Sequence, residues 1–375
     1  MRNGDNFNTT PPKQRILVTP LNWGLGHATR CIPIINELIS LNCEVFVAAS
    51  GDSYFLLKKE FPTAIILHIP GYKIKYSRNK KWLPFKLFLQ SPQFFFSICK
   101  EYLWLKKTIK KYRINAVISD NRFGMHAKNI PCVYITHQLL IRTGNTFSEK
   151  FLQKIHYFFI KRFNCCWVPD YEKNGIAGEL SHQANMPGNV LYAGPLSRFG
   201  IEKNMPVIYE VIISISGPEP QRTIFEKIIL SQIKFTNKKI LVVRGLPGEN
   251  TPLMPETASV KIVNHLSSYN LNKAFQQSEI IICRSGYTTI MDLAKLGKKA
   301  VLVPTPGQTE QEYLAHYLMK NNFFYSVDQD KFFFDSAIKA ALSFPFKTFS
   351  RPMNAYKKII NKFVMSVKSG NLLTQ

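Results

Sequence analysis

Short apolar runs alternate along the chain with longer segments in which apolar residues recur every three or four positions. Such runs are typical of buried strands, and the longer spacing is typical of amphipathic helices. In the first half, the predicted strands cover residues 15–19, 44–48, 64–68, 116–119, 132–136, 166–168 and 190–193. The pattern restarts with predicted strands at 207–214, 239–243, 260–263, 279–283 and 299–303. This alternation predicts an α/β protein with parallel sheets and crossover helices.

Two series of strands predict two Rossmann-like, doubly wound domains that face each other across a central cleft, with ligands at the carboxyl ends of the strands. A Gly-Pro turn in AGPLSRFG marks the boundary. The predicted division is a flexible leader at 1–14, a first domain at 15–198, a second domain at 199–348, and a C-terminal helix and tail at 349–375. The leader contains no apolar core of a signal peptide, and no run of eighteen apolar residues predicts a membrane span.

A glycine-containing stretch, PLNWGLGHATR, follows the first predicted strand and precedes a predicted helix that begins at Cys31. Gly24 and Gly26 suit a dinucleotide loop, but Thr29 occupies the third glycine position and the second strand does not end in an acidic residue. The stretch is therefore better explained as a turn that admits a ligand, with His27 at the mouth of the cleft. A structural role for His27, capping its own helix, is the alternative.

The most informative segment reads EIIICRSGYTTIMDLAKLGKKAVLVPTPGQTEQEYLA. Its turn at Ser285 and Gly286 opens a helix and leaves room for diphosphate oxygens, which the helix dipole favours. Asp292, two turns along that helix, can accept from ribose hydroxyls. The amides of Gln308 and Gln311 can bind the hydroxyls of a hexose. As an ordered set, these residues predict a sugar-nucleotide site.

This segment resembles the donor-binding motif of glycosyltransferase family 28, in which a strand, Arg-Ser/Ala-Gly, Thr and an acidic residue precede Pro and a Gln-containing loop. PLNWGLGHATR is similar to the GGTGGH loop of that family. The resemblance implies the GT-B architecture. It also implies transfer of a sugar from a nucleoside diphosphate with inversion, without a bound metal and with no cofactor besides the nucleotide-sugar substrate.

The resemblance implies three groups of site residues. For catalysis, it implies His27 as the base, with Asp120 orienting it or taking its place. The acceptor side would comprise Gly24, Gly26, His137 and Gln138. For Asp120 and His137, a purely structural role is the alternative. The donor side would comprise Arg198, Ser216, Gly217, Arg222, Leu266, Arg284, Ser285, Gly286, Thr288, Asp292, Gln308 and Gln311. Asp292 is one methylene shorter than the Glu of the family, and Arg222 is expected to supply charge beside a glycine loop altered to SISGPEPQRT.

The formal net charge of +25 implies an anionic partner. Residues 73–113 hold twelve Lys or Arg, ten aromatic residues and a single acid, Glu101. Three explanations stay open for this basic aromatic segment: a core helix with a basic solvated face, an anionic membrane surface, and nucleic acid, which is the least favoured. The seven cysteines show no metal-ligand spacing and are expected to be reduced thiols in the cytoplasm.

The resemblance, together with the basic aromatic segment, implies an enzyme that moves a hexose, N-acetylglucosamine or a similar sugar, from a UDP-sugar to a lipid-linked or cell-envelope acceptor. Its expected location is cytoplasmic, peripheral on the inner face of the membrane. One alternative is an epimerase of GT-B fold, which should place several carboxylates around the sugar. Another is a non-catalytic protein that binds the membrane surface.

Overall fold

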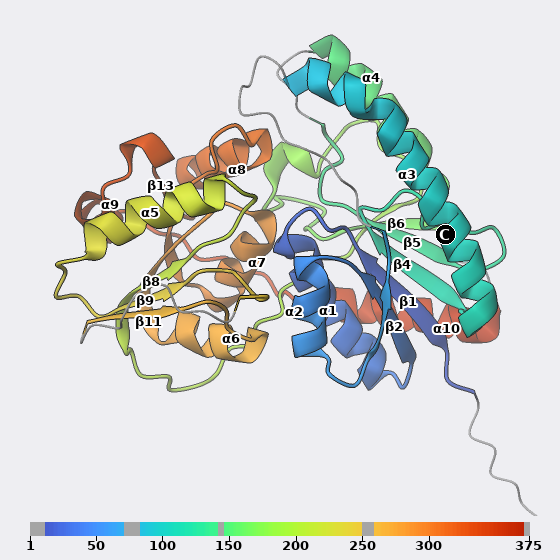
Figure 1. The fold of residues 1–375 in the computed structure, drawn as a ribbon, viewed down its shortest axis with the longest axis horizontal. Coiled ribbons are helices and arrows are strands. Elements are labelled where there is room, and N and C mark those ends of the chain that lie inside the picture. Colours follow the sequence, from blue (N-terminus) through green and yellow to red (C-terminus); the bar gives the residue numbers. More distant parts are fainter. Residues whose placement is uncertain (1–11, 71–82, 142–145, 250–258, 371–375) are drawn as a thin grey trace, which may run out of the picture.

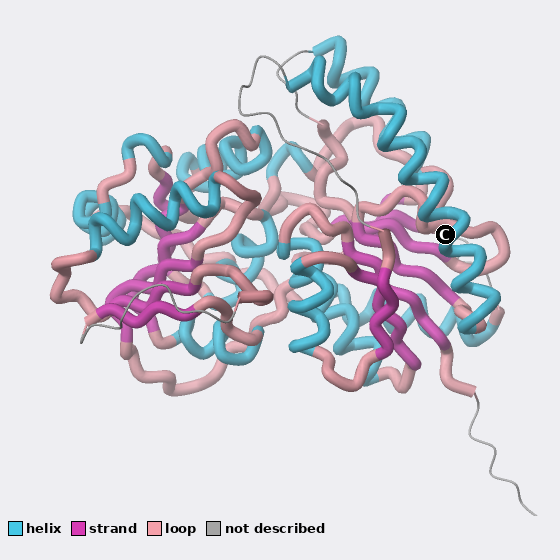
Figure 2. Tube along the Cα trace, viewed as in Figure 1, coloured by secondary structure: helices cyan, strands magenta, loops and turns pink. Residues whose placement is uncertain are grey.

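The computed structural model describes residues 12–70, 83–141, 146–249 and 259–370 (Figure 1). Residues 1–11 of the predicted leader and residues 73–82 of the basic aromatic segment lie outside this part of the chain. Two α/β units lie side by side, each with a parallel sheet that has helices on both faces (Figure 2). The predicted fold class is therefore confirmed.

The first domain is built on a seven-stranded parallel sheet with the order β3-β2-β1-β4-β5-β6-β7. Its strands are β1 (Arg15–Pro20), β2 (Glu44–Ala49), β3 (Ile65–His68), β4 (Ala116–Asp120), β5 (Cys132–Ile135), β6 (Cys165–Val168) and β7 (Val190–Tyr192). Its helices are α1 (Leu25–Ser40), α2 (Asp52–Glu60), α3 (Leu83–Tyr112) and α4 (Thr146–Ile160). Most strands begin and end within two residues of the prediction, because their apolar runs are buried on both faces of the sheet.

The second domain repeats this plan with a six-stranded parallel sheet, in the order β10-β9-β8-β11-β12-β13. Its strands are β8 (Tyr209–Ser214), β9 (Ile240–Val243), β10 (Val260–Val263), β11 (Ser278–Cys283), β12 (Lys299–Leu302) and β13 (Tyr325–Ser326). Its helices are α5 (Gln221–Ile233), α6 (Ser268–Gln276), α7 (Tyr287–Leu296), α8 (Thr309–Lys320) and α9 (Phe334–Leu342). In both sheets the strand order reverses beside the first strand, so each domain has a crevice at the carboxyl ends of two adjacent strands.

The last helix, α10 (Ala355–Ser369), returns from the second domain to the first and packs against α1. Phe363 on α10 meets Trp167 of β6 edge to face, with ring centroids 5.5 Å apart. One buried hydrophobic cluster includes residues from both sheets, α1, α7 and α10. The two domains are therefore joined by a shared apolar core as well as by the linker.

In the described part of α3, the basic aromatic segment has an inner and an outer face. Ile98, Glu101, Leu105 and Thr108 recur at helical spacing and are buried. Glu101 accepts a hydrogen bond of 2.6 Å from Arg122, which places the single acid of the segment in a buried ion pair. The outer face of residues 93–112 carries exposed lysines and the exposed rings of Phe95 and Phe96, so this part of the segment has a buried inner face and a basic outer surface. None of the described helices has the length and apolar character needed to cross a membrane.

Candidate active site

Helix α1 begins at Leu25, six residues earlier than predicted, so His27 lies in its first turn and not in a loop. Gly24, directly before the helix, has a φ of +100°, which glycine adopts without strain. Arg30 is three residues after His27, and residues at this spacing share one face of a helix. The sequence of the opening stretch therefore places an imidazole and a guanidinium together at the carboxyl end of β1.

Asp120 is the last residue of β4, which pairs with β1 so that Pro20 and Asp120 are partners in register. Arg30 holds this buried carboxylate with both arms of its guanidinium: Nε donates to Oδ2 at 2.6 Å, and Nη2 donates to Oδ1. His27 Nδ1 lies 3.2 Å from Oδ2 and 3.3 Å from Oδ1 of the same carboxylate. The two predicted catalytic residues are thus in contact, at the crevice of the first sheet.

The charge states of these groups follow from burial and from Arg30. Burial acts against the ionised form of Asp120, but Arg30 and His27 together outweigh it and hold the pKa of Asp120 at about 2. Burial lowers the pKa of His27 below 6.5, although Asp120 opposes the shift. At neutral pH, Asp120 is therefore an anion and His27 is a neutral imidazole.

Arg30 and Asn121 together determine which ring nitrogen of His27 carries the proton. Arg30 Nη2 has two hydrogens, and it lies close to three acceptors: Asp120 Oδ1, His27 Nδ1 at 2.8 Å, and Asn121. When the side-chain amide of Asn121 is flipped, both its oxygen and its nitrogen find partners. The oxygen then accepts from Arg30 Nη2 at 3.1 Å, and the nitrogen donates to Tyr134 and Thr136. The two hydrogens are then used, and His27 can donate Nδ1–H to Asp120. This leaves Nε2 as the unprotonated nitrogen, which a base requires.

The predicted acceptor residues His137 and Gln138 contact the second domain. His137 Nε2 lies 2.8 Å from Glu310 Oε1, and Gln138 donates to Glu310 Oε2 at 2.7 Å. The His137 ring stacks on Tyr287 with centroids 4.3 Å apart. Glu310 is at the start of α8 and Tyr287 at the start of α7, so both donor-side helices meet this histidine.

Gly26 is where the opening stretch touches the donor motif. Thr288 Oγ1 donates to the Gly26 carbonyl at 3.0 Å, and a Cβ on Gly26 would lie 3.4 Å from that hydroxyl. An alanine at position 26 would therefore be in van der Waals contact with the Thr288 side chain. The residues predicted from separate motifs, Gly26 and Thr288, are therefore brought together by the fold.

Asp292, the predicted ribose ligand, is buried and already has partners. Its Oδ1 accepts from Ser197 at 2.7 Å, and its Oδ2 accepts from Arg198 at 3.3 Å. Burial raises the pKa of Asp292 in spite of Arg198. Arg198, predicted to face phosphate, instead connects the linker to α7 and also donates to Ser268. The two predicted donor ligands therefore bind each other in this structure.

Two other donor-side side chains, those of Arg284 and Ser285, point into the domain, and the predicted approach of the diphosphate to the backbone of this turn stays a prediction. Arg284 donates to the carbonyls of Val303 and Pro304 and lies over the Phe225 ring. Ser285 is fully buried and donates to the Gln311 carbonyl. These contacts fix the turn between β11 and α7, so these two side chains shape the loop.

The two glutamines form a bonded pair. Gln311 Oε1 accepts from Thr305 N at 2.9 Å, while Gln311 Nε2 donates to Gln308 Oε1 at 2.6 Å. Arg222 is similarly engaged, with Glu219 at 2.5 Å and Glu226 at 3.4 Å. Its charge is therefore balanced within α5 and the preceding loop.

Backbone positions on the donor side remain open to a ligand. A Cβ on Gly286, directly before α7, would meet nothing within 4 Å, and the first turn of α7 has no acidic residue. Gly217, at the end of the β8 loop, is exposed with a φ of +110°. Ser216 beside it and Leu266, which follows β10, are both partly buried. Their predicted roles in binding stay predictions.

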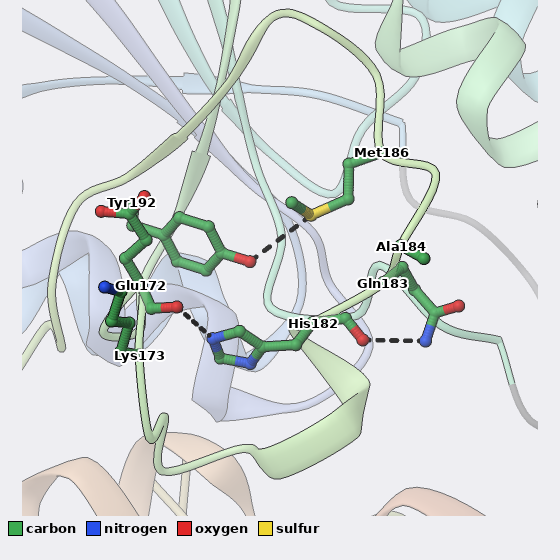
Figure 3. A pocket seen from close by; sticks show the side chains of 7 residues that line it. All are labelled: Glu172, Lys173, His182, Gln183, Ala184, Met186 and Tyr192. Carbon is green, nitrogen blue, oxygen red and sulfur yellow. Dashed lines mark hydrogen bonds between the residues drawn. The ribbon is translucent and has the colours of Figure 1, made fainter.

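A cavity of about 410 Å³ lies elsewhere in the first domain (Figure 3). It is lined by Glu172, Lys173, His182, Gln183, Ala184, Met186 and Tyr192. None of these belongs to the predicted site, and His182 is held by backbone carbonyls through both ring nitrogens. The candidate active site is instead the network around Asp120, because it combines a buried ion pair, two histidines and shifted pKa values at the crevice of the sheet. Within the described ranges, no three His, Cys, Asp or Glu residues are grouped so that they could hold a metal ion.

Comparison with known proteins relates the second domain to a family of glycosyltransferases. Residues 215–359 match the sequence profile of the glycosyltransferase family 28 C-terminal domain. The second domain is therefore of the glycosyltransferase family 28 type. The chain is 26% identical over 82% of both chains to the UDP-N-acetylglucosamine--N-acetylmuramyl-(pentapeptide) pyrophosphoryl-undecaprenol N-acetylglucosamine transferase of Pasteurella multocida.

Solved structures show that this glycosyltransferase has the GT-B fold. The kitacinnamycin glycotransferase matches with a TM-score of 0.62 at 12% identity, covering 96% of this chain and 97% of that one. MurG of Acinetobacter baumannii matches with a TM-score of 0.50 at 14% identity, covering 96% of each chain. At these identities, the structural likeness concerns the fold alone.

Sequence reasoning missed three residues of the network: Arg30, Glu310 and Tyr287. Arg30 was hidden because the helix was predicted to begin after it. Glu310 stands between the two glutamines that were singled out, and its partner His137 is 173 residues away in the chain. A helical spacing that joins His27 to Arg30 was the one signal in the sequence that could have identified Arg30.

Proposed function

We propose that this protein is an inverting glycosyltransferase that moves N-acetylglucosamine or a similar hexose from a UDP-sugar to a lipid-linked or cell-envelope acceptor. The observation that carries the proposal is the His27–Asp120 pair at the crevice of the first sheet, directly opposite the donor-motif helix α7. The nature of donor and acceptor is suggested by the name of the Pasteurella multocida relative, which the chain matches across both domains.

In this mechanism His27 acts as the general base. Its Nε2 takes the proton of the acceptor hydroxyl while the hydroxyl oxygen attacks the anomeric carbon of the sugar. The bond between that carbon and the diphosphate oxygen breaks, and its electron pair leaves with the diphosphate. Asp120 accepts the Nδ1–H of His27 and stabilises the imidazolium that forms. With a pKa of about 2, Asp120 is a much weaker base than His27, so it serves as the partner and not as the substitute.

The leaving diphosphate requires positive potential on the donor side. The N-terminus of α7, with the open space beside Gly286, offers backbone N–H groups and the positive end of a helix dipole. We assign this role to the backbone, because the Arg222 and Arg284 side chains are engaged inside the domain. The proposed transfer uses no metal ion and no resident cofactor.

Donor binding should change the contacts of Asp292. This carboxylate can accept from ribose hydroxyls only by exchanging its bond to Ser197 or Arg198 for the sugar. Arg198, released from Asp292, would then be available to the diphosphate. The pairing seen here would thus hold two donor ligands in place until the nucleotide arrives.

The acceptor is proposed to lie at an anionic membrane surface. Phe95 and Phe96 on α3 and Phe158 on α4 are exposed, and Lys100 and Arg162 stand over two of these rings. Aromatic rings beside cations suit the headgroup region of a bilayer. The proposed location is the cytoplasmic face of the membrane, peripherally bound.

Calorimetric titration with UDP, UDP-glucose and UDP-N-acetylglucosamine tests the donor assignment. We expect UDP and at least one UDP-sugar to bind, with Asp292→Ala weakening the binding, and we expect release of UDP to be unaffected by EDTA. Tyr269→Ala, an exposed substitution on α6, is the matched control and should bind as the native protein does. Absence of binding by every nucleotide at millimolar concentration would sink the proposal.

A further inference from the structure

Five side chains form a continuous hydrogen-bonded chain across the domain interface. It runs from Glu310 on α8 through His137 and Arg30 to Asp120 and His27. His27 and Asp120 are the proposed base and its partner, while Glu310 belongs to the other domain. The chain therefore connects the donor side of the interface to the proposed base.

Arg30 determines which nitrogen of His137 is protonated. A guanidinium can only donate hydrogen bonds, and Arg30 Nη1 lies 3.0 Å from His137 Nδ1. Nδ1 must therefore accept, and the proton of the neutral ring is on Nε2. Nε2–H then donates to Glu310 Oε1 at 2.8 Å. Glu310 and Arg30 thus select the same tautomer of His137 from opposite sides.

The His137 ring has little room to rotate or to move away from Arg30 and Glu310. It is buried, and Tyr287 stacks on one face with an interplanar angle of 12°. The Tyr287 hydroxyl donates to the Pro169 carbonyl at 2.8 Å, which ties the stacking ring to the first domain. Without Glu310, the ring would lose the acceptor for Nε2–H, and its other tautomer would direct Nδ1–H at the Arg30 guanidinium.

A displacement of Arg30 would directly change the hydrogen bonds of His27, the proposed base. Arg30 is 2% exposed and its other nitrogens hold Asp120. The two hydrogens on Nη2 decide whether His27 Nδ1 donates to Asp120 or accepts from Arg30. In the second case Nε2 of His27 carries the proton and cannot accept one from a hydroxyl.

We propose that Glu310 is a positioning residue which, through His137 and Arg30, keeps His27 in the tautomer that can act as a base. The base would then be complete only while α8 of the second domain lies against the first. This inference rests on the proposed function for its kinetic consequence, but its structural consequence, the tautomer of two histidines, is independent of activity.

Glu310→Ala and Glu310→Gln test the proposal, with Tyr317→Phe as the matched control. Tyr317 lies on the same helix and donates across the same interface, to the Gly175 carbonyl at 3.1 Å, without contacting the five hydrogen-bonded side chains. The kinetic measurement is hydrolysis of UDP-N-acetylglucosamine, followed as release of UDP. Glu310→Ala should lower kcat at least ~10-fold with little change in KM, since a lost orienting carboxylate affects proton transfer more than binding. Glu310→Gln keeps an oxygen for His137 Nε2–H and should restore most of the rate.

Histidine nitrogen NMR gives the second measurement, with signals assigned by His27→Gln and His137→Gln. In the native protein we expect the Nε2–H tautomer at His137 and the Nδ1–H tautomer at His27. In Glu310→Ala both signals should move toward the other tautomer, and in Tyr317→Phe neither should. Unchanged tautomers in Glu310→Ala overturn the inference, as does a kcat equal to that of Tyr317→Phe. If native protein releases no UDP, the kinetic part of the proposed function fails, while the NMR result still decides the role of Glu310.

Discussion

Asp120 shows how one buried carboxylate can organise a site. An unpaired carboxylate in the interior would be protonated, because burial disfavours its charge. Arg30 reverses this balance by two charge-assisted hydrogen bonds, and the pKa falls to about 2. Asp120 therefore stays ionised at neutral pH. It can hold the Nδ1–H of His27 and stabilise an imidazolium, but it cannot itself remove a proton from a hydroxyl near neutral pH.

Removal of the His27 imidazole should abolish most of the transfer. His27→Ala is expected to lower kcat at least ~100-fold, the usual effect of losing a general base. UDP binding should stay near that of the native protein. Native kcat/KM should fall as pH drops through the pKa of His27, which burial places below 6.5, because only the neutral ring accepts a proton. His316→Ala, an exposed histidine on α8, is the control, and equal rates for the two variants would exclude His27 as the base.

At the scale of elements, strands were predicted far better than the start of helix α1. Strands such as β1 and β11 are continuous apolar runs bounded by turn residues, and burial on both sheet faces forces that composition. Helix α1 was predicted to begin at Cys31, because the helical spacing of apolar residues is first seen there. In the structure the helix continues through Pro33 to Leu25, because β1 and Asp120 hold its first turns. Asp120 belongs to β4 and lies about ninety residues further along the chain. A contact between residues so far apart cannot be predicted from the local pattern of the sequence. The two-residue strand β13 was not predicted.

Helix α10 should contribute to stability through the single face that it buries. Phe363 is 1% exposed and packs on Trp167, so Phe363→Ala should lower the free energy of unfolding by about 3–5 kcal/mol, as for other large core truncations. Met365, two residues later, is 62% exposed, and Met365→Ala should change it by less than about 0.5 kcal/mol. Urea denaturation followed by tryptophan fluorescence compares the two. Equal effects would mean that α10 is not anchored through Phe363.

At the scale of the whole molecule, the site is assembled by two domains that repeat one topology. The sequence predicted both sheets and the residues after their first strands, because these depend on local pattern. It could not predict which side chains meet across the interface, such as His137 with Glu310 or Asp292 with the linker residues Ser197 and Arg198. These pairs depend on how the domains pack through their common apolar cluster. Residues assigned separately to donor and acceptor therefore became one connected network only in the folded molecule.

The net charge of +25 and the outer faces of α3 and α4 predict binding to anionic membranes. The two helices lie side by side along one edge of the first domain (Figure 1), and Phe95 of α3 contacts Phe159 of α4. Replacement of both Phe96 and Phe158 by Ser removes one exposed ring from each helix and leaves every charge unchanged. This variant should float less with vesicles of phosphatidylcholine and phosphatidylglycerol than the native protein does.

Phe235→Ser is the matched control, because Phe235 is 87% exposed beside Lys234 but lies in the second domain. Native protein should not float with vesicles of phosphatidylcholine alone, since the attraction of lysines to the surface needs anionic lipid. If Phe235→Ser reduced flotation as much as the double variant, the bound surface would not be the α3–α4 edge. Loss confined to the double variant would place that edge against the bilayer.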